Sequence, residues 1–215
     1  MAPKHRRNHA TVYSIIRQIL LRFANPLSPK SYYEDPSQWL PKFEAIFEGL
    51  NLNWAIIGGE AALQYRLESR DTVDLDFVVN NVTELITVLE ERGFTFRVLR
   101  ERDDSPYLLQ GTTPDGMHFD IYEAHTDFER HALERHIEHY ASPEDVIVYK
   151  LMAWRPQDRD DIVHILAAET NLDYAYIEHW AQEWEVIDNW QSVMAGFERK
   201  HAPPIVQKGR GKNGV

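Results

Sequence analysis

Three aspartates of this sequence have a spacing that would let them do chemistry together. Asp74 and Asp76 alternate with apolar residues in the run VDLDFVV, so in a strand both carboxylates point to one face, about 6.5–7 Å apart along the backbone. Asp120 lies in a second alternating run, MHFDIY, on the face opposite its apolar neighbours. Carboxylates that converge from neighbouring strands can bridge hard divalent cations, which prefer oxygen ligands. Three of them could clamp two Mg²⁺ ions while one activates an attacking hydroxyl, as in in-line phosphoryl or nucleotidyl displacement.

Alternate acids on a strand are also typical of a polar row that faces solvent. A second feature of the sequence helps to decide between such a row and a metal site. Gly58 and Gly59 lie between a short apolar run, Trp54–Ile57, and a helix-like stretch from Glu60 to about Leu67. A glycine turn at this point can present backbone N–H groups to a phosphate. The same dipeptide is also an ordinary tight turn, and by itself it leaves both interpretations open.

The apolar periodicity predicts the elements that must position these groups. Strands are predicted over residues 54–57, 73–79, 94–99, 107–112 and 117–122, and helices over 12–23, 39–50, 60–67 and 82–92. Pro114-Asp115-Gly116 predicts the turn of a hairpin. Ser37 is the expected N-cap of the second helix. From about residue 126 the pattern is helical: Ser142 caps one helix, Pro156 opens the next, and residues 173–199 supply two more.

This order of elements predicts an α+β fold, a mixed sheet with helices followed by a helical C-terminal part. We divide the chain into a basic tail over 1–9, N-terminal helices over 10–50, a catalytic core over 51–125, a helical region over 126–200 and a second basic tail over 201–215. The tails are interpreted as solvated termini, with a nucleic-acid-binding arm as the alternative.

Composition narrows the class of protein. The 215 residues carry a formal net charge of −11, 43% are hydrophobic, and none is cysteine. Thiolate metal sites, a cysteine nucleophile and wholesale disorder are therefore excluded. No apolar stretch approaches the roughly 20 residues that span a bilayer, so we expect a cytoplasmic protein without a membrane partner. The acidic balance argues against broad nucleic-acid binding but leaves room for a local basic groove.

The glycine pair and the acids together carry a family resemblance. Gly58-Gly59 followed by Arg70-x-Thr72-x-Asp74-Leu-Asp76 resembles the nucleotidyltransferases of the DNA polymerase β superfamily, and the Arg-x-Thr-x-Asp-x-Asp form is most similar to the AbiEii-type toxin branch. A second block, SPEDVIVYKLMAWRPQDRDDIVHIL over residues 142–166, is similar to the helical region that follows the catalytic domain there. The resemblance covers roughly residues 50–170 and implies a nucleotidyltransferase-like mixed sheet.

The resemblance also implies roles for individual residues. Asp74, Asp76 and Asp120 would hold the metal, two Mg²⁺ ions or alternatively Mn²⁺, and Asp120 would also be the base for the acceptor hydroxyl. The groups that it places around the nucleotide are Gly58, Gly59, Arg70, Thr72, Lys150, Asp158 and Asp161.

Several of these positions have an ordinary alternative. Lys150 could be a surface lysine of an amphipathic helix, and Asp158 and Asp161 could be acids favoured near a helix N-terminus.

Glu60 departs from the family pattern, because a small or apolar residue would suit a phosphate cradle better. The histidines show no metal-binding spacing: His131, His136 and His139 do not share one helical face.

The function implied is a Mg²⁺-dependent nucleotidyltransferase that moves a nucleoside monophosphate from an NTP to a hydroxyl acceptor. RNA, first of all the 3′ end of tRNA, is the expected acceptor, and the expected role is that of a toxin in a toxin–antitoxin or phage-defence system with a cognate antitoxin. Two alternatives stay open at this point. One is an antibiotic nucleotidyltransferase acting on an aminoglycoside-like drug, whose positive charge would suit an acidic protein. The other is a catalytically inactive module that binds a nucleotide or a partner protein.

Overall fold

The computed structural model describes residues 38–72, 74–101 and 103–201. Both predicted tails, the predicted helix over 12–23 and Ser37 lie outside this part of the chain. The strands are β1 (Trp54–Ile57), β2 (Asp74–Val79), β3 (Thr95–Arg100), β4 (Pro106–Thr112) and β5 (His118–Glu123). The helices are α2 (Leu40–Gly49), α3 (Gly58–Leu63), α4 (Thr83–Glu91), α5 (Asp127–Arg135), α6 (Pro143–Ala153), α7 (Pro156–Ala168), α8 (Tyr174–Glu183) and α9 (Ile187–His201).

The strands form one mixed sheet in the order β1-β2-β5-β4-β3. The central pair, β2 and β5, runs parallel, and every other pair is antiparallel. Hairpin β4–β5 turns at Pro114-Asp115-Gly116, where Gly116 N–H donates to the Thr113 carbonyl at 2.9 Å. The mixed sheet followed by helices confirms the predicted fold class, whereas the division of the chain into five regions stays a prediction.

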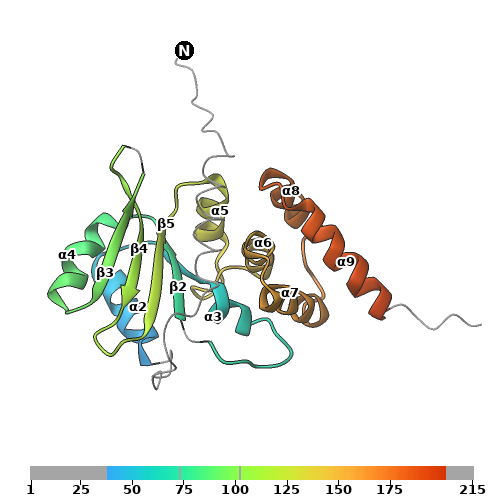
Figure 1. Cartoon of the computed structure of the whole chain (residues 1–215), viewed down its shortest axis with the longest axis horizontal. Helices are drawn as coiled ribbons and strands as arrows, with labels where there is room; N and C mark the ends of the chain where they lie inside the picture. The colour runs from blue at the N-terminus through green and yellow to red at the C-terminus, as the bar shows by residue number, and fades with distance from the viewer. Residues whose placement is uncertain (1–37, 73, 102, 202–215) are drawn as a thin grey trace, which may run out of the picture.

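The alternation of side chains gives the sheet one apolar and one polar face. Phe77 of β2 and Phe119 of β5 point to the apolar face, where Phe43 of α2 meets their rings at centroid distances of 4.9 and 5.4 Å. Figure 1 shows α2 behind the sheet. Because successive strand residues point to opposite faces, the neighbouring acids Asp76 and Asp120 must lie on the other face.

The helices from α5 onward pack beside the sheet rather than on its apolar face (Figure 1). Helix α6 lies at their centre and is buried nearly all round, including its polar residues. Its N-terminus is capped as predicted, because Ser142 Oγ accepts from Asp145 N–H at 3.2 Å. Trp180 of α8 and Trp184, the C-cap of this helix, are buried in the core. In the described residues no helix is both long and apolar enough to cross a membrane.

A buried cluster of ion pairs ties the loop after α3 to helices α6 and α7. Asp161 of α7 is fully buried, and its two carboxylate oxygens accept from Arg70 Nε and Nη2, each at 2.9 Å. Arg66 also binds Asp161, and Lys150 Nζ of α6 lies 2.8 Å from it. Lys150 reaches the second buried acid, Asp158, at 3.3 Å. Buried charges are tolerated only when they are paired in this way.

This cluster also explains where the structure departs from the predicted helix over 60–67. Helix α3 begins at Gly58 and ends at Leu63. After Gln64 the chain leaves the helical path, so that Tyr65 Oη can donate to the Ala141 carbonyl at 3.0 Å and Arg66 can reach α7. The contacts with distant residues therefore decide where this helix ends, and a local pattern does not contain them.

We expect Asp161→Asn to destabilise the protein strongly. Removing this carboxylate leaves Arg70 without its ion-pair partner, Arg66 with only exposed Asp160, and Lys150 with only Asp158. Breaking a buried ion pair by removing one partner typically costs about 3–5 kcal/mol in the free energy of unfolding. The matched control is Asp160→Asn: Asp160 binds the same Arg66, but 58% of its side chain is exposed, so the loss should stay below about 1 kcal/mol. Urea denaturation measures both values.

The pH dependence of this difference provides a second check. Burial alone would raise the pKa of Asp161, but hydrogen bonds from Arg70 and the charge of Lys150 outweigh it and lower the pKa to about 2. The stabilisation is therefore complete above the unfolded pKa of about 3.9 and is lost as the pH falls toward 2. Equal stability of Asp161→Asn and Asp160→Asn at neutral pH would contradict the role given to the cluster.

Candidate active site

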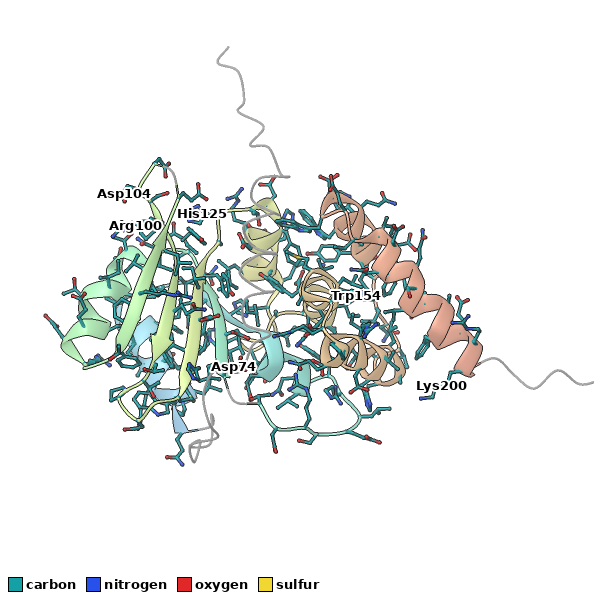
Figure 2. The ribbon with its side chains drawn as sticks, in the orientation of Figure 1. Asp74, Arg100, Asp104, His125, Trp154 and Lys200 are labelled. Atoms are coloured by element: carbon teal, nitrogen blue, oxygen red, sulfur yellow. The ribbon has the colours of Figure 1, made fainter. Side chains whose placement is uncertain are left out.

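The structure brings the three aspartates to one face of the sheet. Asp76 and Asp120 are direct register partners on the parallel strands β2 and β5, and Asp74 pairs with His118 one step along the same face. Neighbouring strands lie about 4.7–4.9 Å apart, so the backbones of Asp76 and Asp120 are adjacent. All three acids are half-buried and hence within reach of solvent. Figure 2 shows Asp74 at the beginning of β2, beside α3.

The environment disfavours negative charge on Asp76 and on Asp120. Burial, followed by the charges of Asp74 and Asp120, raises the pKa of Asp76 well above its ordinary value, although Lys150 and Arg155 act in the opposite direction. For Asp120, burial and the charge of Asp74 raise the pKa to about 6, against the lowering effect of nearby hydrogen-bond donors and of Arg97. Like charges are thus crowded on this face, and a divalent ion would relieve their repulsion.

The donor set suits Mg²⁺ or Mn²⁺ in its chemistry, because it consists of carboxylate oxygens. The three carboxylates do not form a ready-made clamp, however. Among the described residues, no group of three or more Asp, Glu or His side chains is already arranged to hold a metal ion. The carboxylate of Asp120 is engaged by Gln110, whose Nε2 donates to its two oxygens at 2.8 and 3.0 Å. Strand register therefore creates the cluster, and the other two carboxylates would have to turn toward Asp120 to complete a metal site.

The glycine turn lies directly against the acids. Gly58 has a φ of +69°, and a Cβ on it would lie 1.9 Å from Asp76 Oδ2. Only glycine lets the turn approach this carboxylate so closely, and it also adopts the left-handed conformation without strain. At Gly59 a Cβ would lie 3.3 Å from both Arg70 Nη2 and Thr72 Cγ2, so the second glycine packs on the loop that leads into β2.

The other residues predicted around the nucleotide bind one another instead of facing open solvent. Arg70 is held by Asp161, and Thr72 Oγ1 donates to Glu60 at 3.1 Å, which gives the unexpected acid after the glycines a partner. Lys150 is 2% exposed and is not a surface lysine, so that alternative is wrong.

Asp158 and Asp161 are not merely helix-end charges either, because both are completely buried and paired with cations. Asp158 accepts from Arg155, through its backbone N–H at 2.8 Å and its Nε at 2.7 Å. That these acids and Lys150 contact a nucleotide stays a prediction. In the structure they pair with one another and with arginines, which ties α6 and α7 to the loop after α3.

Two residues next to the acids were not among the predicted site residues. The first is Arg155, whose side chain is 27% exposed. Its hydrogen bond with Asp158 raises its pKa, and the charges of Asp76 and Asp74 add to the rise.

The second is Gln110, which pairs with Asp120 in the antiparallel hairpin. The sequence did contain a signal for this residue. Positions 110 and 120 are equally far from the predicted turn at Asp115, so a symmetric hairpin places them opposite one another.

Comparisons with known proteins add the following. No protein-family model matches the sequence, and no curated protein matches it. The solved structure of the lincosamide antibiotic adenylyltransferase LnuA with lincomycin bound is 13% identical over 61% of this chain and 97% of LnuA, with a TM-score of 0.45. A nucleotidyltransferase-like antigenic protein from Paracoccidioides brasiliensis is 16% identical over 93% of this chain and 91% of its own, with a TM-score of 0.44. The antibiotic-resistance factor ANT(2'')-Ia is 21% identical over 78% of this chain and 98% of its own, with a TM-score of 0.43. TM-scores below 0.5 decide nothing about activity, which has to be argued from the residues of this chain.

We expect Gly58→Ala to disturb the site more than its backbone conformation alone explains. The substitution combines a left-handed φ, which costs about 1–2 kcal/mol for a non-glycine residue, with a clash against Asp76. Gly116→Ala is the matched control, because Gly116 has a φ of +92° and open space where the Cβ would lie. Thermal unfolding of both variants measures the difference, and an equal loss of stability in the two would show that the approach to Asp76 does not matter.

We expect Asp76→Asn to stabilise the protein at neutral pH. Because the native pKa of Asp76 is raised, the folded state loses stability as the pH rises above about 4, and the asparagine variant does not. Its melting temperature should exceed that of the wild type by about 2–4 °C at pH 7.5 for each kcal/mol of repulsion removed, and the advantage should vanish at pH 4.

Asp115→Asn, which removes an exposed acid from the β4–β5 turn, is the control for net charge and should show no such pH-dependent gain. Adding Mg²⁺ should narrow the gap between wild type and Asp76→Asn at pH 7.5, because an ion that binds only the folded wild-type site stabilises it. A variant that melts below the wild type at pH 7.5 would contradict the crowding of charge described above.

Proposed function

We propose that this protein is a Mg²⁺-dependent nucleotidyltransferase, which transfers a nucleoside monophosphate from an NTP to a hydroxyl acceptor and releases pyrophosphate. The observation that carries the proposal is the pairing of Asp76 with Asp120 across two parallel strands, with Asp74 on the same face and the Gly58 turn against Asp76. A sheet that crowds three half-buried carboxylates loses stability by doing so, and metal binding is the simplest reason for keeping them.

Asp74, Asp76 and Asp120 would hold two Mg²⁺ ions, or Mn²⁺ in their place, which when bound neutralise phosphate charge and orient the reacting oxygens. Asp120 accepts the proton of the acceptor hydroxyl while the hydroxyl oxygen attacks the α-phosphorus. The bond from that phosphorus to the β-phosphate oxygen breaks, and the electron pair leaves with pyrophosphate. Gly58 and Gly59 would approach the triphosphate through their backbone.

Positive charge for the leaving group is available beside the acids. Arg155 and Arg70 are 27% and 25% exposed, and each is fixed on one side by a buried aspartate. An arginine held in this way loses little further entropy when it binds a phosphate. Asp158 and Asp161 would then act by orienting these guanidinium groups, and Lys150 by balancing the buried charge.

For the acceptor we propose RNA, with the 3′ end of tRNA first, and for the biological role that of a toxin with a cognate antitoxin. The support is the resemblance of two ordered blocks, Arg70-x-Thr72-x-Asp74-x-Asp76 and residues 142–166, to the AbiEii-type branch. The proposed substrates are cytoplasmic, and we propose the same location for the protein. A cationic antibiotic is the second candidate acceptor, because a net charge of −11 would attract it.

The test supplies purified protein with each of four labelled NTPs, Mg²⁺ or Mn²⁺, and either total tRNA or a panel of aminoglycosides. We expect label in RNA and a loss of at least about 100-fold in Asp76→Asn and Asp120→Asn, because removing a metal ligand costs more than the 10–100-fold seen for its supporting residues. Asp115→Asn is the matched control in the same hairpin and should transfer normally.

Each other result has a definite meaning. Label in an aminoglycoside instead of RNA would select the second candidate. NTP and Mn²⁺ binding without transfer to any acceptor would select the inactive binding module and refute the proposed reaction. Transfer that survives in Asp76→Asn would refute the proposed site.

A further inference from the structure

A row of polar side chains crosses the outer half of the same sheet face. Arg97 of β3 pairs with Gln110 of β4, and Gln110 pairs with Asp120 of β5, so the three residues are register partners on three successive strands. Asp120 in turn pairs with Asp76 of β2. The row therefore ends at the proposed catalytic acids.

The hydrogen bonds along this row all run from donor to acceptor in one direction, from Arg97 through Gln110 to Asp120. Gln110 Nε2 donates to Asp120 Oδ1 at 2.8 Å and to Oδ2 at 3.0 Å. The other end of the same amide, Gln110 Oε1, accepts from Arg97 Nε at 2.9 Å and from Arg97 Nη2. Arginine has only donors and an ionised carboxylate only acceptors, so the amide between them has one favourable orientation. The reverse orientation would set its oxygen against the carboxylate and its NH₂ against the guanidinium.

This arrangement restricts the rotation of the carboxylate. One amide nitrogen bonded to both oxygens fixes the plane of the Asp120 carboxyl group. A carboxylate has about four lone-pair sites. Gln110 occupies one on each oxygen and the Tyr122 side chain, which also hydrogen-bonds to Asp120, occupies a third, so one stays free for a metal ion or a hydroxyl. The geometry points to Gln110 as a positioning residue for Asp120, with Arg97 setting the orientation of Gln110. This inference rests on the proposed function.

A purely structural role accounts poorly for the row. Arg97 is exposed and Gln110 and Asp120 are half-buried, so their hydrogen bonds compete with water. The β3–β4 and β4–β5 pairings are held by their backbone ladders and by buried Leu108 and Leu109. Removal of the Gln110 amide should therefore leave the fold intact and act on what Asp120 does.

The experiment is a double-mutant cycle between Gln110 and Asp120, read in two ways. The first readout is Mn²⁺ affinity of the protein without nucleotide, measured by calorimetry, and the second is kcat and KM for NTP transfer. We expect Gln110→Leu to lower Mn²⁺ affinity and kcat by about 10–100-fold, the usual effect of losing a group that orients a metal ligand, and to leave KM unchanged. In an Asp120→Asn background the same substitution should cause no further loss of Mn²⁺ affinity.

Two further variants separate orientation from net charge. Arg97→Gln should lower both quantities in the direction of Gln110→Leu. Arg100→Gln removes the same charge from the same strand. Figure 2 shows Arg100 near the tip of the β3–β4 hairpin, away from Asp74, so this variant should match the wild type. If Gln110→Leu melts early, Gln110→Met replaces it, since methionine is an unbranched side chain of similar length that carries no charge and no N–H donor.

The outcomes distinguish this inference from the proposed function. If Gln110→Leu keeps the Mn²⁺ affinity and the kcat of the wild type, the inference is overturned. The proposed function still stands in that case, provided that the wild-type protein transfers nucleotide. Equal losses in the Asp120 and Asp120→Asn backgrounds would also overturn it. A wild type that transfers nothing, with a fall in Mn²⁺ affinity that depends on Asp120, would refute the function and support the positioning role.

Discussion

The parallel pairing of β2 with β5 is the constraint on which the site depends. It places Asp76 beside Asp120 on one face. On the opposite face Phe77, the residue after Asp76, and Phe119, the residue before Asp120, meet the same ring of α2. A shift of the register by one residue would bury the acids in this aromatic core and expose the phenylalanines. The apolar packing of one face thus holds the backbones of Asp76 and Asp120 next to each other, so movement of the strands cannot relieve the charge repulsion on the other face.

The cations nearest to these acids are held back from them by a second set of acids. Arg70, Arg155 and Lys150 could in principle pair with Asp74 and Asp76, but each is bound by Asp158 or Asp161. The strong, partly buried pairs at α7 prevent the collapse of the arginines onto the carboxylates of β2. An acidic cluster and a cationic cluster therefore lie side by side, and the proposed metal-bound triphosphate would contact both.

Much of this could be read from the sequence, and the remainder depends on contacts between distant residues. The alternation in VDLDFVV and HFDIYE gave the correct face for each acid, and the turn at Pro114-Asp115-Gly116 gave the hairpin. Lys150 was beyond such reasoning, because a lysine in a helix looks the same whether the helix lies on the surface or, like α6, in the interior. The partner of Arg70 lies 91 residues away, and no local pattern relates the two.

The net charge of −11 gains a different meaning from this arrangement. The ion-pair cluster contains more cations than acids. Its acids are buried Asp158 and Asp161 and exposed Asp160, and its cations are Arg66, Arg70, Lys150 and Arg155. Asp74, Asp76 and Asp120 lie beside it with an excess of negative charge. At the range of a bound ligand such local differences outweigh the average charge of the molecule, because partly buried charges are screened less than exposed ones. An acidic protein can therefore present a site for polyphosphate, provided that cations fill the acidic half.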